Sequence, residues 1–278
     1  MTDQIAPKLY CSGMAMARFH LLSPSAWMGL CLLCCALLLE PAPGLAAPVA
    51  DAKPGSSTET FVFDAKHLAN PVRLNYRVSS NQFPYRLNGT LLWQHDRQHY
   101  LAQMAFSAFG LSRTQTSRGL IGPDGLAPER FSDQSRSEAS ARFDRVQGRV
   151  SFSANTPALR LLPGAQDRLS VLVQLGALVA SEPGRFSPGV ALAIQTIGPS
   201  SGEMWRFTVE KTEALAWPGG PQPAVKLLRQ PREPQDQRVE VWLAPALGYL
   251  PARIRISETN GDAIDQIWQS SEIAPAPD

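Results

Sequence analysis

The stretch RVEVWLAPALGYLPARIRISETNGDAIDQIWQ, residues 238–269, carries the clearest pattern in the chain. Every second side chain is aliphatic in residues 238–243, and Ile254 and Ile256 repeat that spacing after a turn. The pair Asn260-Gly261 then separates this run from a third. An Asn-Gly pair between alternating segments is the strongest short-range signal of a β-hairpin. The stretch therefore predicts three antiparallel strands joined by tight turns.

The same period of two recurs through most of the remaining chain. Alternation buries one side of each strand and wets the other, as in an antiparallel sheet. Residues 111–120 and 138–146 are more polar, and Gly122-Pro123-Asp124-Gly125 between them is a turn signature. We expect further strands at residues 72–78, 85–93, 100–108, 148–153, 190–197, 205–212 and 225–230.

Residues 167–180, DRLSVLVQLGALVA, form the one convincing helix of the sequence. Asp167 is placed to cap its first amide groups, and Glu182-Pro183-Gly184 ends it. Apolar side chains cover nearly its whole circumference, and such a helix is buried on more than one side. The sequence therefore predicts an all-β, mainly antiparallel fold: a strongly curved sheet or incomplete β-barrel, with one apolar α-helix packed on its concave side.

The N-terminal part has the layout of a secretory signal peptide. An uncharged apolar run at residues 26–39 follows Arg18 and His20, and prolines and small residues come after it. We expect residues 1–46 to be cleaved after Ala46, which would place the protein in the periplasm, free or associated with the envelope. An uncleaved anchor is the alternative, although the run is shorter than the ~20 residues of a membrane span.

The rest of the chain reads as one unit with loose ends. Residues 47–60 are small, polar and proline-containing, as in a flexible linker, and residues 274–278 form a matching disordered tail. No repeat or second composition interrupts residues 61–273, so we expect a single β-rich domain there. No other apolar run approaches spanning length, so no transmembrane segment is expected after signal cleavage.

Composition argues against several classes of function. All four cysteines lie in the leader, which excludes disulfides and cysteine-zinc sites from the mature chain. The net charge of +2 with interspersed signs does not suggest a nucleic-acid binder. His95 and His99 flank a hairpin tip, where their spacing fixes no metal geometry. No nucleophile elbow, phosphate loop or acid/base pair stands out, so we predict no catalytic residues, no metal and no cofactor. A hydrolase with an unrecognised carboxylate pair stays as an alternative.

A series of arginines permits two interpretations. Guanidinium groups bind phosphate and carboxylate bidentately, so the series could contact an anionic lipid head group or polysaccharide. The interpretation that we favour is a solvated outer face, balanced by Asp124, Glu129, Asp133, Glu138 and Asp144. The arginines are Arg113, Arg118, Arg130, Arg136, Arg142, Arg145 and Arg149.

Large apolar side chains of the predicted inner face and helix are candidate ligand contacts. If the sheet curls without closing, they line an apolar cleft suited to an acyl chain; if it closes tightly, they are core. Core is the more frequent role for any one of them. The candidates are Trp93, Tyr100, Met104, Phe106, Leu172, Leu175, Trp205 and Phe207, with Tyr85 on the same predicted face.

Residues 163–179 (PGAQDRLSVLVQLGALV), together with residues 239–256 and the turn after them, resemble an exported bacterial family catalogued as domain of unknown function 3108. The resemblance covers roughly residues 65 to 270. It implies a periplasmic or envelope-associated β-rich domain with no established activity and no catalytic residues to carry over. Its marked positions have structural explanations: Asp167 caps the helix, Gly248 permits a tight turn, Pro251 starts a strand, and Tyr249 covers the sheet edge and hydrogen-bonds a loop carbonyl.

These observations lead to a functional hypothesis with one main alternative. We expect a periplasmic binding or carrier module for a lipid or other apolar or amphipathic ligand, partly by analogy of fold. The alternative is a structural or assembly protein that binds another envelope protein by strand addition.

Overall fold

The computed structural model describes residues 61–82, 86–108, 111–217 and 219–274. The predicted signal peptide, linker and all but the first residue of the tail lie outside these residues, as does Tyr85. Within them, fifteen strands form one sheet. The strands are β1 (Val72–Ser80), β2 (Leu87–His95), β3 (His99–Ala108), β4 (Leu111–Gly122), β5 (Gly125–Gln134), β6 (Glu138–Asp144), β7 (Arg149–Phe152), β8 (Leu159–Arg160), β9 (Gln166–Asp167), β10 (Ala191–Ile197), β11 (Gly202–Leu215), β12 (Gln222–Arg229), β13 (Arg238–Leu243), β14 (Pro251–Ser257) and β15 (Ala263–Ile273).

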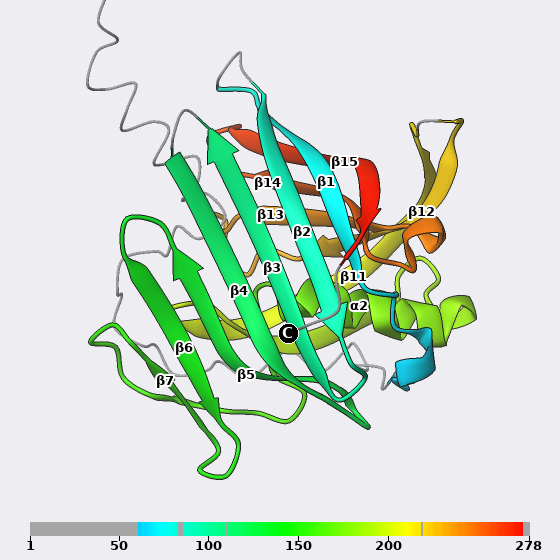
Figure 1. Ribbon diagram of the computed structural model, residues 1–278. Helices are drawn as coiled ribbons and strands as arrows, with labels where there is room; N and C mark the ends of the chain where they lie inside the picture. Colours follow the sequence, from blue (N-terminus) through cyan, green and yellow to red (C-terminus); the bar gives the residue numbers. More distant parts are fainter. Residues whose placement is uncertain (1–60, 83–85, 109–110, 218, 275–278) are drawn as a thin grey trace, which may run out of the picture.

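The sheet is a long meander that is joined in its middle by the two ends of the chain. Its order is β8-β7-β6-β5-β4-β3-β2-β1-β15-β14-β13-β12-β11-β10-β9. Neighbouring strands are antiparallel throughout, except that β9 pairs in parallel with β10. β1 to β7 form one wall, and β10 to β15 curl behind it (Figure 1). The prediction of a strongly curved, mainly antiparallel sheet is confirmed.

Helix α2 (Ser170–Ser181) lies in the concavity between the two walls (Figure 1). Every residue from Ser170 to Val179 is buried, as its apolar circumference predicts. Gly176 lets the helix approach the loop before β14, because a Cβ atom there would lie 2.3 Å from the carbonyl oxygen of Tyr249. Three short 3-10 turns complete the described structure: η1 (Ala65–His67), η2 (Pro183–Arg185) and η3 (Pro245–Leu247).

Glutamine side chains, rather than a backbone ladder, hold the two ends of the sheet together. Gln166 of β9 donates to the carbonyl oxygen of Leu126 in β5 at 2.7 Å, and the amide N–H of Leu126 donates to Gln174 of α2 at 2.8 Å. Gln195 of β10 accepts from the amide of Leu162 and donates to the carbonyl of Arg160, both at 2.8 Å. The sheet is therefore not closed by backbone pairing. Side-chain hydrogen bonds connect its two ends along a seam formed by Gln166, Gln174 and Gln195.

The predicted start of the helix is wrong, and one long strand was not predicted. The helix begins at Ser170 rather than Asp167, because Gln166 and Asp167 pair with Thr196 and Ile197 of β10 before the chain turns into the helix. Strand β5 is absent from the predicted strands. Its inward side carries Asp133 beside Phe131, so a carboxylate interrupts the apolar alternation that would have marked it.

Candidate functional site

A cavity of about 370 Å³ opens at the end of the sheet where α2 begins. The first turn of the helix forms one side, and the ends of β11 to β14 with the loop of residues 230–237 form the other. Its deeper wall is apolar, with Met104, Leu169, Leu172, Trp205, Val239, Ile254 and Ile256. A concave, mostly apolar cavity with a few polar groups is the usual form of a small-molecule site.

The rim on the β11–β12 side is an ion-pair network built on Trp205. Arg229 lies 4.6 Å above the Trp205 ring and donates to Glu203 at 3.2 Å, while the indole N–H donates to the same carboxylate at 2.8 Å. Arg232 contacts Glu203 and lies 3.1 Å from Asp236. Only 5% of the Arg229 side chain is exposed, whereas Arg232 at the outer end is 45% exposed, so this wall is a mutually neutralised charge cluster that is buried at Arg229. The loop of residues 230–237 thus forms part of the cavity wall.

Glu258 stands on the opposite part of the rim, just after β14. Its carboxylate accepts a hydrogen bond from the Gln237 amide at 2.6 Å and forms no ion pair with a basic side chain in the described part of the chain. Burial raises the pKa of Glu258, the hydrogen bond from Gln237 opposes that rise, and the charge of Asp262 adds to it.

The inner face of β4 is polar where it meets the cavity. Arg113 donates to both carboxylate oxygens of Asp133, at 2.7 and 2.5 Å, and Gln115 donates to the same group at 3.1 Å. Gln115 also lines the cavity, so the site has a buried ion pair behind one wall. For Arg113 and Asp133 the favoured interpretation of a solvated outer face is wrong: both are over nine-tenths buried and point inward.

The Asp167 carboxylate forms hydrogen bonds with both the start of α2 and β4. One carboxylate oxygen accepts from the amides of Leu169 and Ser170, at 2.9 and 2.7 Å. The other accepts from the Ser117 hydroxyl at 2.5 Å, and Tyr100 lies 3.0 Å from that hydroxyl. Burial raises the pKa of Asp167 to about 6, against the opposing effect of these hydrogen bonds. The residue stabilises the helix start from within β9 and does not line the cavity.

The structure divides the eight predicted ligand contacts. Met104, Leu172 and Trp205 line the cavity. The others belong to the core: Leu175 and Phe207 have no exposed surface, and Trp93 donates its indole N–H to the carbonyl of Ala69 at 2.9 Å. Tyr100 and Phe106 are likewise buried away from the cavity.

Val239, Ile254 and Ile256 of the cavity wall are absent from the predicted contacts. Their alternation is plain in the sequence, but only the strand order shows that they face the start of α2. The alternation predicts that these side chains are buried, but it does not predict that they border a cavity.

The three turn positions singled out by the sequence form one tight connection. Gly248 and Tyr249 both have left-handed backbone conformations, with φ of 62° and 63°, and a Cβ atom at Gly248 would lie 2.9 Å from that of Ala69. Pro251 begins β14 and accepts a hydrogen bond from the Tyr76 hydroxyl at 2.6 Å. The expected bond from the Tyr249 hydroxyl to a loop carbonyl is not found among the described residues.

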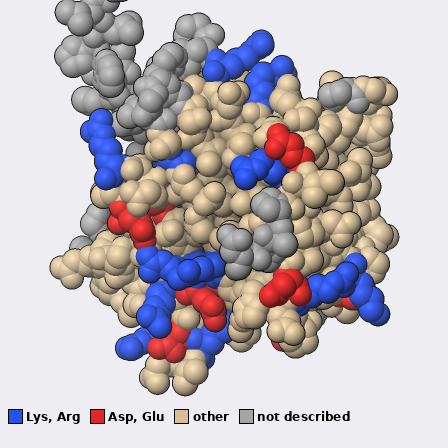
Figure 2. All heavy atoms as spheres, viewed as in Figure 1, with Lys and Arg blue, Asp and Glu red and all other residues tan. Residues whose placement is uncertain are grey.

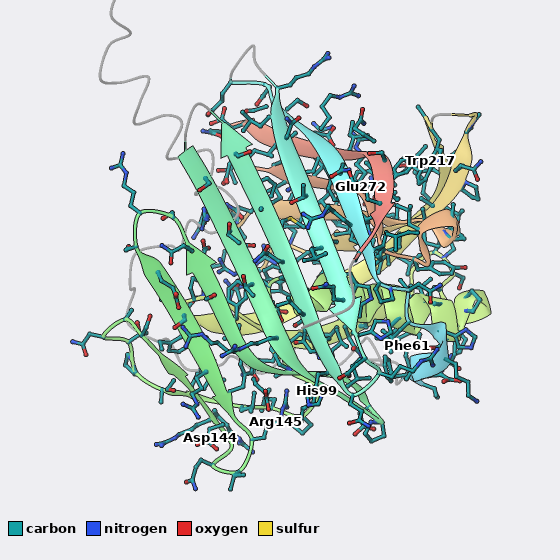
Figure 3. The ribbon with its side chains drawn as sticks, viewed as in Figure 1. Phe61, His99, Asp144, Arg145, Trp217 and Glu272 are labelled. Atoms are coloured by element: carbon teal, nitrogen blue, oxygen red, sulfur yellow. The ribbon has the colours of Figure 1, made fainter. Side chains whose placement is uncertain are left out.

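Three further arginines of the series lie on the outer face of β4 to β6, and Arg136, Arg145 and Arg149 lie in the adjoining turns and at the start of β7. Arg118, Arg130 and Arg142 lie opposite one another on adjacent strands. Arg130 pairs with Glu138, and acidic side chains of the same hairpins, including Asp144 beside Arg145, lie among them (Figures 2 and 3). Both signs of charge therefore share this face, as in the solvated interpretation.

The histidines do not converge. His95 lies 3.0 Å from the carbonyl oxygen of Ala69, and His99 contacts Asp96 at 3.1 Å. Across the described ranges, no group of three or more His, Asp or Glu side chains is placed to hold a metal ion. Within the same ranges, none of the helices has the length and hydropathy of a membrane span.

Comparisons with known proteins support the fold and name a family. The chain is similar to a solved β-barrel-like protein of the domain of unknown function DUF1849 from Brucella abortus, with a TM-score of 0.51 and 11% sequence identity, over 75% of this chain and 99% of that one. At that identity the likeness shows the fold alone. No curated protein matches the sequence significantly. The model of one family matches residues 75–266, so the chain belongs to the family described as a protein of unknown function, DUF3108.

Proposed function

We propose that this protein is an exported binding or carrier module that takes an amphipathic ligand, such as a lipid or an acyl chain, into the cavity beside α2. The observation that carries the proposal is the cavity itself, apolar in its depth and charged at its rim. The leader pattern of residues 1–46 supports an envelope location, and the periplasm is the compartment that we propose.

The size of the cavity suits such a ligand. About 370 Å³ is near the lower end of the ~300–1,000 Å³ of typical ligand pockets. At about 30 Å³ for a water molecule, this volume corresponds to roughly twelve non-hydrogen atoms of that size. A ligand with a short apolar body would fill the depth, and its polar end would meet the charged rim.

The geometry favours this role over strand addition. A strand-adding surface needs a long free edge, and the two strands that end the described sheet, β8 and β9, have two residues each. Beyond Val209, which bonds to Gly189 and Val190, β11 has no partner on its β10 side among the described residues, but that edge carries Glu210, Lys211 and Glu213, charges that oppose pairing.

Binding without catalysis is also part of the proposal. Among the described carboxylates, Asp133 and Asp167 are the most deeply buried, and neither lines the cavity. Asp133 is bound by Arg113, and Asp167 by backbone amides and Ser117, so each already has a structural role.

Native mass spectrometry of protein purified from the periplasm tests the proposal directly, together with uptake of a fluorescent fatty alcohol. We expect a co-purifying lipid or saturable uptake. Val239→Trp should fill the cavity and abolish both, whereas Thr116→Trp on the outer face of β4 should not. The proposal fails if the folded wild type carries no lipid and takes up no probe.

A further inference from the structure

The cavity is bordered by four carboxylates and three guanidinium groups, and most of these charges already neutralise one another. Glu203 and Asp236 hold Arg229 and Arg232 in the network over Trp205. A guanidinium that is bonded to two carboxylates has little remaining attraction for a third. An anionic ligand would have to displace Glu203 or Asp236 to reach these arginines.

The second feature that usually attracts anions is occupied as well. The first turn of α2 borders the cavity, and a helix N-terminus favours negative charge. Here the amides of Leu169 and Ser170 are bound by the buried carboxylate of Asp167. The protein therefore supplies its own anion to the helix, and no second anion is needed there.

Two carboxylates at the rim remain outside this neutralised set. Glu233 is exposed at the outer edge and accepts from the Gln235 amide at 2.7 Å. Glu258 is partly buried, and the one side-chain partner that its carboxylate has in the described ranges is the neutral Gln237 amide. Arg168 belongs to the other side of the cavity, against Gly198 in the turn between β10 and β11.

We infer that the cavity selects amphipathic ligands with a positively charged head, an ammonium or guanidinium group, and that Glu258 is its main partner. This inference rests on the proposed function and adds the class of head group to it. An ammonium group at the rim would form a charge-assisted hydrogen bond with Glu258 while the apolar body occupies the wall of Leu172, Val239 and Ile256. The raised pKa of Glu258 is consistent with a carboxylate that lacks a cation.

The test compares three probes with the same twelve-carbon chain: dodecylammonium, dodecyl sulfate and dodecyl maltoside. Each is titrated below its micelle concentration, with calorimetry as the readout. We expect dodecylammonium to bind about tenfold more tightly than dodecyl sulfate, from one charge-assisted hydrogen bond. The preference should shrink as salt is added, because the rim is open to solvent.

Glu258→Gln should remove most of the preference for dodecylammonium and leave the affinity for dodecyl maltoside unchanged. Glu258→Asp should keep part of it. The matched control is Glu272→Gln on β15, which removes the same charge from an exposed residue that does not line the cavity (Figure 3).

The possible results separate the two claims. If dodecyl sulfate binds as tightly as dodecylammonium, or if Glu258→Gln weakens all three probes equally, the inference on head group is wrong and the binding role stands. If none of the three probes binds the folded wild type, the proposed function itself is wrong.

Discussion

At the scale of single residues, Asp167 is the most constrained group of the structure. It is fully buried, and its described hydrogen-bond partners are amide and hydroxyl groups rather than a basic side chain. Desolvation disfavours its charged form more than these bonds favour it, so its pKa rises from 3.8 to about 6. The same carboxylate binds the first amide groups of the helix and offsets the partial positive charge at its N-terminus.

This shift predicts a pH dependence of stability with a definite sign. A carboxyl group whose pKa is higher in the folded state binds its proton more tightly there, so its contribution to the free energy of unfolding grows as pH falls through about 6. Asp167→Asn cannot titrate. The difference in unfolding free energy, wild type minus Asp167→Asn, should therefore rise by about 1 to 2 kcal/mol from pH 7.5 to pH 5. Urea unfolding of both proteins at both pH values measures it, and a flat or falling difference would contradict the assignment.

At the scale of elements, the contact between α2 and the loop before β14 depends on one missing side chain. Gly176→Ala would add a Cβ atom 2.3 Å from the Tyr249 carbonyl oxygen, a backbone atom with little freedom to move. The gain in helix propensity, up to about 1 kcal/mol, should be outweighed by an overpacking cost of ~1–3 kcal/mol.

Gly184→Ala is the matched control for Gly176→Ala. Gly184 lies in η2 just beyond the helix, and nothing meets its added Cβ within 4 Å. We expect a net loss of unfolding free energy for Gly176→Ala and almost none for Gly184→Ala, in chemical denaturation at neutral pH. Equal effects of the two substitutions would mean that the helix does not approach the loop this closely.

The seam gives a second prediction at this scale. Gln174→Leu keeps the volume of the side chain but leaves the buried amide of Leu126 without its acceptor, at a cost of ~1–3 kcal/mol. Hydrogen exchange should quicken at the start of β5 and at β9. Gln103→Leu, on the outer face of β3, should change neither the free energy of unfolding nor the exchange rates much. The hydrogen bond from the Gln103 side chain to Thr116 is long, at 3.4 Å, and partly exposed. Unchanged exchange at Leu126 in the folded Gln174→Leu protein would show that the seam is held by other contacts.

At the scale of the whole molecule, the sequence predicts the type of fold better than the arrangement of its parts. Alternation and the Asn260-Gly261 turn are local, so the strands and hairpins follow from them. Period two separates two faces of a strand without saying which is inside. In β4 both faces are polar, so Arg113 and Gln115 could not be told from the outward Thr114 and Thr116. The cavity could not be predicted from the sequence either. Its wall is formed by α2 and by strands that lie next to it only because of the strand order, which local patterns do not determine.

The place of β1 between β2 and β15 has a consequence for how the chain acquires its fold. The first strand of the described chain has one neighbour from the following hairpin and another from the far end, with Val72 opposite Ile273. A nascent chain that lacks β15 therefore leaves half the hydrogen bonds of β1 unmade, and pairings of such long sequence separation form slowly. The two walls of the sheet can therefore join only after β15 has been synthesised.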